Sequence, residues 1–134
     1  MALDVGERRI GVALSDPLLI LASPLTTFAR KNLSADIEVV LGLITDHEVN
    51  VIVVGLPLSL NGKEGPQAKL TRKFTDVLEA QSPVPVRTFD ERFSSFEAEQ
   101  LLRDAGKQPS RDKGSIDSAA AAVILQRYLD KLRK

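Results

Sequence analysis

The sequence predicts an α/β protein whose core is a mixed five-stranded sheet flanked by helices. Three apolar strand segments follow one another closely near the start of the chain, and two further strand segments each follow an amphipathic helix. Closely spaced strands favour an antiparallel meander, whereas a strand reached through a crossover helix pairs in parallel. The expected sheet therefore joins a three-stranded antiparallel meander to two parallel strands.

The strands of the meander are expected at residues 2–5, 9–14 and 23–28, where apolar residues are bounded by turn signals. Gly6 ends the first strand, and Asp16-Pro17 marks the turn between the second and the third.

Helices and strands alternate in the rest of the chain. Ser34 is expected to cap a first helix, because the apolar residues after it recur at helical spacing. Four β-branched residues at 51–54 predict a strand that is buried on both faces. The later elements are a helix over 67–80, a strand over 84–89, a helix from Ser94 or Ser95 to Asp104, and a last helix opened by Ser115. This order of elements is that of the ribonuclease H fold.

The bulk composition predicts a single domain over residues 1–134. The chain is 43% hydrophobic and 27% charged, and no segment reaches the ~20 consecutive apolar residues of a membrane span. The absence of cysteine excludes a disulfide framework, a thiolate zinc site and a catalytic thiol. We expect a cytoplasmic protein, since the chain does not open with a secretory signal.

Overall charge does not indicate a nucleic-acid-binding protein. The 18 basic and 18 acidic residues balance, so any such surface must be a local patch. Aromatic residues are scarce, with 5 Phe and 1 Tyr, most of them at core-like positions. Recognition is therefore expected to depend on shape and phosphates.

Carboxylates stand next to apolar segments at three places in the chain. Asp4 lies inside the first strand, Asp90-Glu91 end the last strand, and Asp117 lies at the start of the last helix. Because the carboxyl ends of parallel strands open onto one crevice, these acids are expected to converge there. Side chains alternate along a strand, so Asp90 and Glu91 point to opposite faces and we favour Glu91 for the site.

Each acid also has an ordinary structural interpretation. Asp4 has the spacing to pair with Arg8 or Arg9, the Asp90-Glu91 pair has arginine neighbours, and Asp117 suits the positive end of a helix dipole. Taken together, the acids favour a metal site, because clustered carboxylates repel one another unless a hard cation holds them. Mg²⁺ or Mn²⁺ prefers oxygen ligands of this kind, and such a site indicates phosphoryl chemistry.

Basic and polar residues near these acids are candidates for contacts with phosphates. Arginine binds two phosphate oxygens at once through its planar fork. The loop from Gly55 to Gly65 is a further candidate, because its backbone amides precede a helix. An ordinary flexible connection is an equally good interpretation of this loop. The candidate substrate-binding residues are Arg8, Arg9, Asn61, Lys63, Arg92 and Arg111.

Four blocks of sequence resemble the signatures of the YqgF/RuvX family, a family of pre-16S ribosomal RNA nucleases and Holliday-junction-resolvase-like proteins. The blocks are DVGERRIGVA at 4–13, VGLP at 54–57 followed by Asn61-Gly62, DERFSS at 90–95 and DSAAA at 117–121. They span essentially the whole chain in the family's order. Family members usually carry a few more residues ahead of the first aspartate, so the first strand looks shortened here.

The resemblance implies a RuvC-like ribonuclease H fold and an endonuclease dependent on Mg²⁺ or Mn²⁺. It places Asp4, Glu91 and Asp117 at the family's acidic positions, and it implies a role in maturing the 5′ end of 16S ribosomal RNA.

Other functions remain open at this stage. A Holliday junction resolvase would use the same chemistry on branched DNA but would need a dimer, and the sequence fits either a monomer or a homodimer. A non-catalytic RNA-binding or ribosome-associated module would keep the fold without cutting. An actin-like or sugar-kinase-like nucleotide-binding protein also uses an Asp-x-Gly turn, but such proteins need two domains of this kind.

Overall fold

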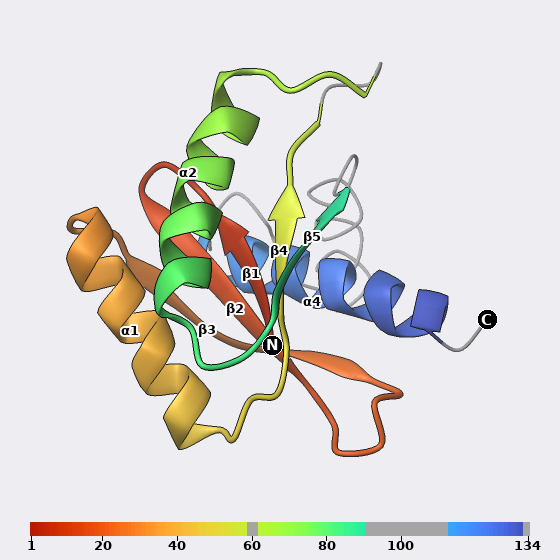
Figure 1. Ribbon diagram of the computed structural model, residues 1–134. Helices are drawn as coiled ribbons and strands as arrows, with labels where there is room; N and C mark the ends of the chain where they lie inside the picture. Colours follow the sequence, from red (N-terminus) through yellow and green to blue (C-terminus); the bar gives the residue numbers. More distant parts are fainter. Residues whose placement is uncertain (59–61, 91–112, 133–134) are drawn as a thin grey trace.

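The computed structural model describes residues 1–58, 62–90 and 113–132, and these ranges contain five strands and three helices. The strands are β1 (Ala2–Val5), β2 (Arg9–Ser15), β3 (Ala22–Ala29), β4 (Ile52–Leu56) and β5 (Val86–Asp90). The helices are α1 (Leu33–Asp46), α2 (Pro66–Gln81) and α4 (Lys113–Leu132) (Figure 1).

The strands form one mixed sheet in the order β3-β2-β1-β4-β5. β1 pairs antiparallel with β2, and β2 pairs antiparallel with β3. β1 and β5 both pair in parallel with β4. The predicted fold class is confirmed, because the meander and the two parallel strands meet at β1 in the centre of the sheet.

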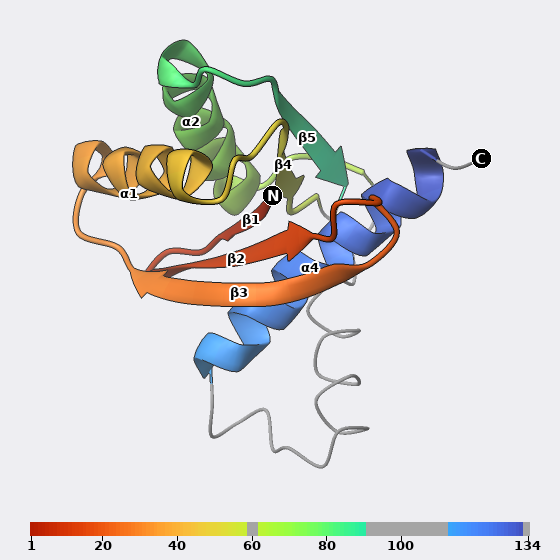
Figure 2. The same cartoon turned by 90° about the horizontal axis from the view of Figure 1, so that it is seen from below.

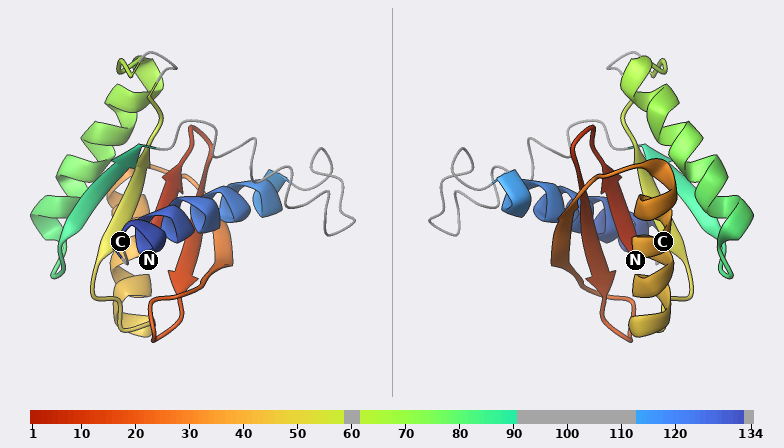
Figure 3. Two further views of the ribbon diagram at one scale, coloured as in Figure 1. Left: turned by 90° about the vertical axis from the view of Figure 1, so that its right-hand side faces the viewer. Right: turned by 90° about the vertical axis from the view of Figure 1, so that its left-hand side faces the viewer.

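Helices cover both faces of the sheet. α1 and α2 lie on one face and α4 crosses the other (Figures 2 and 3). Leu3 packs in a cluster with Ile37 and Phe74 from the first two helices, whereas its neighbour Ala2 packs with Ile124 of α4. Successive residues of a strand point to opposite faces, so the alternation along β1 divides the core into two layers.

Small residues set the layer between the sheet and α4. The alanines at 119–122 of α4 are all buried. On the sheet side, Ala2 and Ala13 face the helix. The helix axis can therefore approach the strands more closely than larger side chains would permit.

The first helix begins earlier than its sequence pattern predicted. Asn32, not Ser34, is the N-cap, and its side-chain oxygen accepts a hydrogen bond from the Ala35 amide at 2.8 Å. Both residue types cap helices well. Starting at Asn32 places Asp36 in the first turn, where it accepts hydrogen bonds from Arg30 and from the Lys31 amide. The contact of Asp36 with Arg30 and Lys31 therefore occurs together with the earlier start of α1.

The last helix also begins earlier than expected. α4 starts at Lys113 instead of Ser115, so Asp117 is its fifth residue and lies beyond the first turn. The expected helix from Ser94 or Ser95 to Asp104 lies outside the described residues. No helix within residues 1–58, 62–90 and 113–132 combines the length and the apolarity that crossing a membrane requires.

The turn between β2 and β3 is held rigidly at both ends. The Asp16 carboxylate accepts hydrogen bonds from the amides of Ile20 and Leu21, which explains the turn expected at Asp16-Pro17. From α4, the Gln126 side chain accepts from the Ala22 amide at 2.9 Å and donates to the Ile20 carbonyl at 2.8 Å. One amide side chain therefore ties the hairpin to the helix across the sheet.

Candidate active site

Asp4 lies on the face of the sheet that α4 covers. Its neighbours Leu3 and Val5 point into the core beneath α1 and α2, so alternation turns Asp4 to the other side. In the antiparallel register its partner is Gly11 of β2. Residues that face each other across two strands share one face, and Gly11 therefore also lies toward α4.

Gly11 is the point at which α4 rests on the sheet. A Cβ atom added to Gly11 would lie 2.1 Å from the carbonyl oxygen of Asp117 and 2.8 Å from the amide nitrogen of Ser118. Only a residue without a side chain permits this approach. Asp4 and Asp117 thus both border Gly11, one from the paired strand and one from the helix above it. The backbones of both aspartates are therefore next to Gly11.

An ion pair fixes the Asp117 side chain. The Nε of Arg9 donates to the Oδ2 of Asp117 at 2.7 Å, with the Arg9 side chain 37% exposed and the Asp117 side chain 25% exposed. A carboxylate has room for several further donors or a cation. Arg9, a candidate substrate contact, lies against a candidate metal ligand and offsets part of its charge.

Side chains that the sequence did not single out hold the turn after β1. The Nη1 of Arg30 donates to the Gly6 carbonyl at 3.0 Å, and the Nε2 of Gln67 donates to the Val5 carbonyl at 3.0 Å. Arg30 is itself held by Asp36 at 2.9 Å and lies 5.4 Å from the Phe74 ring centroid. The segment directly after Asp4 is therefore held by Arg30, which follows β3, and by Gln67 of α2. No local sequence signal marks Gln67 for this role.

The carboxyl ends of the three parallel strands meet at one edge of the sheet. Phe89 of β5 is in register with Gly55 of β4 and packs with the α4 layer. Asp90 comes next, so alternation directs it to the α1 and α2 face. Within the described residues, β5 thus turns its terminal aspartate away from the face that carries Asp4.

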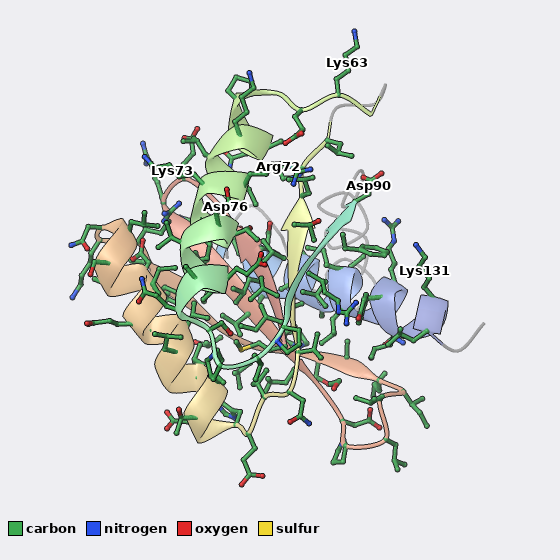
Figure 4. The ribbon with its side chains drawn as sticks, in the orientation of Figure 1. Lys63, Arg72, Lys73, Asp76, Asp90 and Lys131 are labelled. Atoms are coloured by element: carbon green, nitrogen blue, oxygen red, sulfur yellow. The ribbon has the colours of Figure 1, made fainter. Side chains whose placement is uncertain are left out.

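Several candidate residues cannot be placed. Glu91, favoured as the third acid, lies outside the described residues, as do Asn61, Arg92 and Arg111. Arg8 and Lys63 are described and exposed, with Arg8 in the turn after β1 and Lys63 in the loop before α2 (Figure 4). His47 follows the last residue of α1 and is exposed.

The donor set at Gly11 suits a hard divalent cation. Asp4 and Asp117 are both partly exposed and supply carboxylate oxygens, which Mg²⁺ and Mn²⁺ prefer, and solvent can complete the coordination. Among the described residues there is no group of three or more acidic or histidine side chains gathered as a complete site. The two aspartates fit the metal as a partial set, and Glu91 would complete it.

Comparison with known proteins supports this fold and these motifs. The RuvX family, described as Holliday junction resolvase, matches residues 1–131. A protein of Roseiflexus sp., provisionally named a pre-16S rRNA nuclease, is 48% identical over 99% of this chain and 94% of its own length. A Synechococcus protein with the same provisional name is 44% identical over 100% of this chain and 90% of its own length.

Solved structures share the fold at low sequence identity. RuvC of Thermus thermophilus, in complex with a Holliday junction substrate, is 14% identical, with a TM-score of 0.58 over 97% of this chain and 92% of that chain. The fowlpox virus resolvase, in complex with Holliday junction DNA, is 12% identical, with a TM-score of 0.58 over 98% of this chain and 97% of that chain. The mixed sheet with its flanking helices is therefore a RuvC-like ribonuclease H fold. On the evidence of the family match over residues 1–131 and of relatives at 44–48% identity, the chain belongs to the RuvX family.

Proposed function

We propose that the protein is a metal-dependent endonuclease that cuts a phosphodiester bond at the Gly11 junction of β2 and α4, with Asp4, Asp117 and Glu91 as the ligands of Mg²⁺ or Mn²⁺. The observation that carries the proposal is the placement of Asp4 and Asp117 on either side of Gly11, at the edge where the parallel strands end. Carboxylates from neighbouring elements favour binding a hard cation, because its charge offsets their mutual repulsion.

Residues of the chain position the two aspartates and supply the charges of the proposed metal site. Asp4 is fixed by β1, whose following turn is tied down by Arg30 and Gln67. Asp117 is fixed by its ion pair with Arg9. When bound, the metal would activate a water molecule and stabilise the leaving oxygen of the phosphodiester. Arg8, Arg92, Arg111, Asn61 and Lys63 are proposed as contacts to the phosphates on either side of the cut.

The proposed substrate is the precursor of 16S ribosomal RNA, cut at its 5′ end in the cytoplasm. This assignment is supported by the provisional names of the relatives from Roseiflexus and Synechococcus, which match nearly the full chain. Arg9 at the start of β2 and Arg8 in the adjoining turn are cations, and cations recognise phosphates without reading base sequence.

A Holliday junction resolvase is the second candidate. It is favoured by the family's description and by the likeness to two resolvases whose structures contain junction DNA. Cutting two opposed strands of a junction symmetrically requires two active sites, so this function would need a homodimer. The oligomeric state in solution therefore bears directly on the choice.

The test compares a pre-16S RNA carrying its 5′ leader with a four-way DNA junction. Each is incubated with wild type, Asp4→Asn and Asp76→Asn, in Mn²⁺ and in chelator. Asp76 is an exposed aspartate on α2 and is the matched control for losing one carboxylate (Figure 4). We expect wild type and Asp76→Asn to cut the RNA only with Mn²⁺, and Asp4→Asn to be inactive although folded.

Other outcomes lead to other functions. Cleavage of the junction alone would establish the resolvase, and cleavage of neither substrate would leave a non-catalytic RNA-binding module. Calorimetric titration of Mn²⁺ into the three proteins gives a second readout, since Asp4→Asn should lose metal binding that Asp76→Asn retains. A folded Asp4→Asn protein with full activity would overturn the site assignment.

A further inference from the structure

We propose that the cleft between β5 and the end of α4 binds an unpaired stretch of nucleic acid beside the proposed active site. This β5–α4 cleft has a volume of about 460 Å³. It is lined by Arg87, Thr88, Phe89, Tyr128, Lys131 and Leu132. The proposal deepens the proposed nuclease function, because it names where a single strand that leads to the cut would be held.

The aromatic side chains supply a surface on which bases can stack. The Phe89 and Tyr128 rings meet edge to face, with centroids 6.2 Å apart and planes at 88°. Both residues are half-buried, so their packing against the helix layer holds them in place while part of each ring lines the cleft. Stacking of a base on an aromatic ring contributes about 1–3 kcal/mol and tolerates any sequence. Two of the chain's six aromatic residues thus line this cleft, and stacking on them would add to the recognition by shape and phosphates that the sequence predicts.

Cations border the same aromatic surface. The Nζ of Lys131 lies 5.9 Å from the Phe89 ring centroid, and Arg87 is exposed on the edge strand two residues before Phe89. Positive charge next to stacking rings is the combination that proteins use to bind single strands, because the backbone is anionic and every base has an aromatic face. An acidic peptide would use the cations but would leave the rings without a stacking partner.

The β5–α4 cleft adjoins the edge that contains the proposed site. β5 runs from the cleft residues Arg87 to Phe89 directly to Asp90 at its carboxyl end. Figure 4 shows Lys131 extending from α4 on the side of the molecule where β5 ends at Asp90. A nucleic-acid strand held along the β5–α4 cleft therefore approaches the carboxyl ends of the parallel β-strands.

The intrinsic fluorescence of the protein reports whether the β5–α4 cleft is occupied. Tyr128 is the only tyrosine and there is no tryptophan, so the intrinsic fluorescence of the protein arises from a residue that lines the cleft. A base that stacks there should quench this emission. The measurement uses ten-nucleotide oligouridylate and oligodeoxythymidylate in chelator, so that binding is read without cleavage and RNA is distinguished from DNA.

The charge test compares two double variants that lose the same net charge. Arg87→Gln with Lys131→Gln removes the cations of the cleft, and Lys69→Gln with Lys73→Gln removes two exposed cations of α2. Affinity is measured by fluorescence anisotropy of end-labelled oligonucleotides at several salt concentrations. The cleft variant should bind at least about tenfold more weakly, and its slope of log Kd against log salt should fall by about 1.4, which is two phosphate contacts at about 0.7 each. The α2 variant should bind as wild type does.

The stacking test uses Phe89→Leu, with urea unfolding to establish that the variant is folded. Its affinity should fall at least about fivefold, the lower limit for losing one stacked base. The proposal would be overturned if the cleft and α2 double variants bound the oligonucleotides with equal affinity, or if binding left the Tyr128 emission unquenched. Because all measurements are made without metal, loss of cleavage in Asp4→Asn and loss of binding in the cleft variants remain separate results.

Discussion

Arg9 and Asp117, 108 residues apart in the chain, form an ion pair of 2.7 Å that joins the start of β2 to the second turn of α4. The pair lies next to Gly11, where the helix backbone rests on the sheet. The Arg9 guanidinium and any metal bound at this site must therefore share the Asp117 carboxylate.

Arg9→Gln should reduce the Mn²⁺ concentration needed for half-maximal cleavage, because it removes a cation that competes for Asp117. A partly exposed ion pair contributes about 0.2–1 kcal/mol, so the change should be about 1.4- to 5-fold. The measurement is a metal titration of activity, with Lys69→Gln, which removes an exposed cation of α2 outside the proposed site, as control. A higher metal requirement in Arg9→Gln would mean that Arg9 positions Asp117 for the metal instead of competing with it.

Gly11→Ala should destabilise the protein by about 3 kcal/mol, at the upper end of the usual cost of overpacking, because its Cβ would collide with backbone that cannot move without shifting α4. Gly42→Ala is the matched control. Gly42 is exposed within α1 and a Cβ there meets nothing within 4 Å, so the change should stabilise the protein by about 0.5–1 kcal/mol. Urea unfolding measures both. A Gly11→Ala protein as stable as wild type would contradict the close packing of α4 on β2.

Asp36→Ala should cost about 2–4 kcal/mol, since Asp36 is 2% exposed and its loss leaves Arg30 without its carboxylate partner. The lower part of this range applies because the Arg30 side chain is 22% exposed and solvent can hydrate it. Thermal and urea unfolding give the value, and Asp76→Ala on the surface of α2 should change stability by less than about 0.5 kcal/mol. Equal effects of the two substitutions would show that the Arg30–Asp36 pair does not stabilise the fold.

Gln126→Ala should loosen the β2–β3 hairpin without unfolding the protein. Two hydrogen bonds from this side chain to the hairpin backbone would be lost, at about 0.5–1.5 kcal/mol each. Hydrogen exchange at the Ala22 amide, which donates to Gln126, should become faster, while exchange in β1 should change only as much as global stability does. Unchanged protection of Ala22 would refute the tie between hairpin and helix.

The sequence predicted the strands well because their patterns are local. β1 was expected at residues 2–5 and is found at Ala2–Val5, and the run of β-branched residues identified β4 within two residues at each end. Helix starts were predicted less well. Asn32 and Ser34 are equally good caps by type, and the contact of Asp36 with Arg30 involves residues outside the helix pattern.

In the candidate site, too, the residues with a local sequence signal were predicted, whereas contacts between distant residues were not. Asp4 and Asp117 were selected because a charge beside apolar residues needs a reason, and the structure brings both to Gly11. The partner of Asp117 was not predictable, because an ion pair between residues 9 and 117 depends on how α4 crosses the sheet. Gln67 and Gln126 act on backbone carbonyls and amides far away in the sequence, and an isolated glutamine carries no signal for that.

The distance along the chain between Arg9 and Asp117 also sets the order of events during protein synthesis. The sheet strands that carry Asp4 and Arg9 leave the ribosome first, and a domain generally folds as a unit once its chain is available. The helix with Asp117 is made 108 residues after Arg9, so the two aspartates cannot meet at Gly11 on a nascent chain that stops before it. The proposed metal site therefore stays incomplete until α4 has been synthesised.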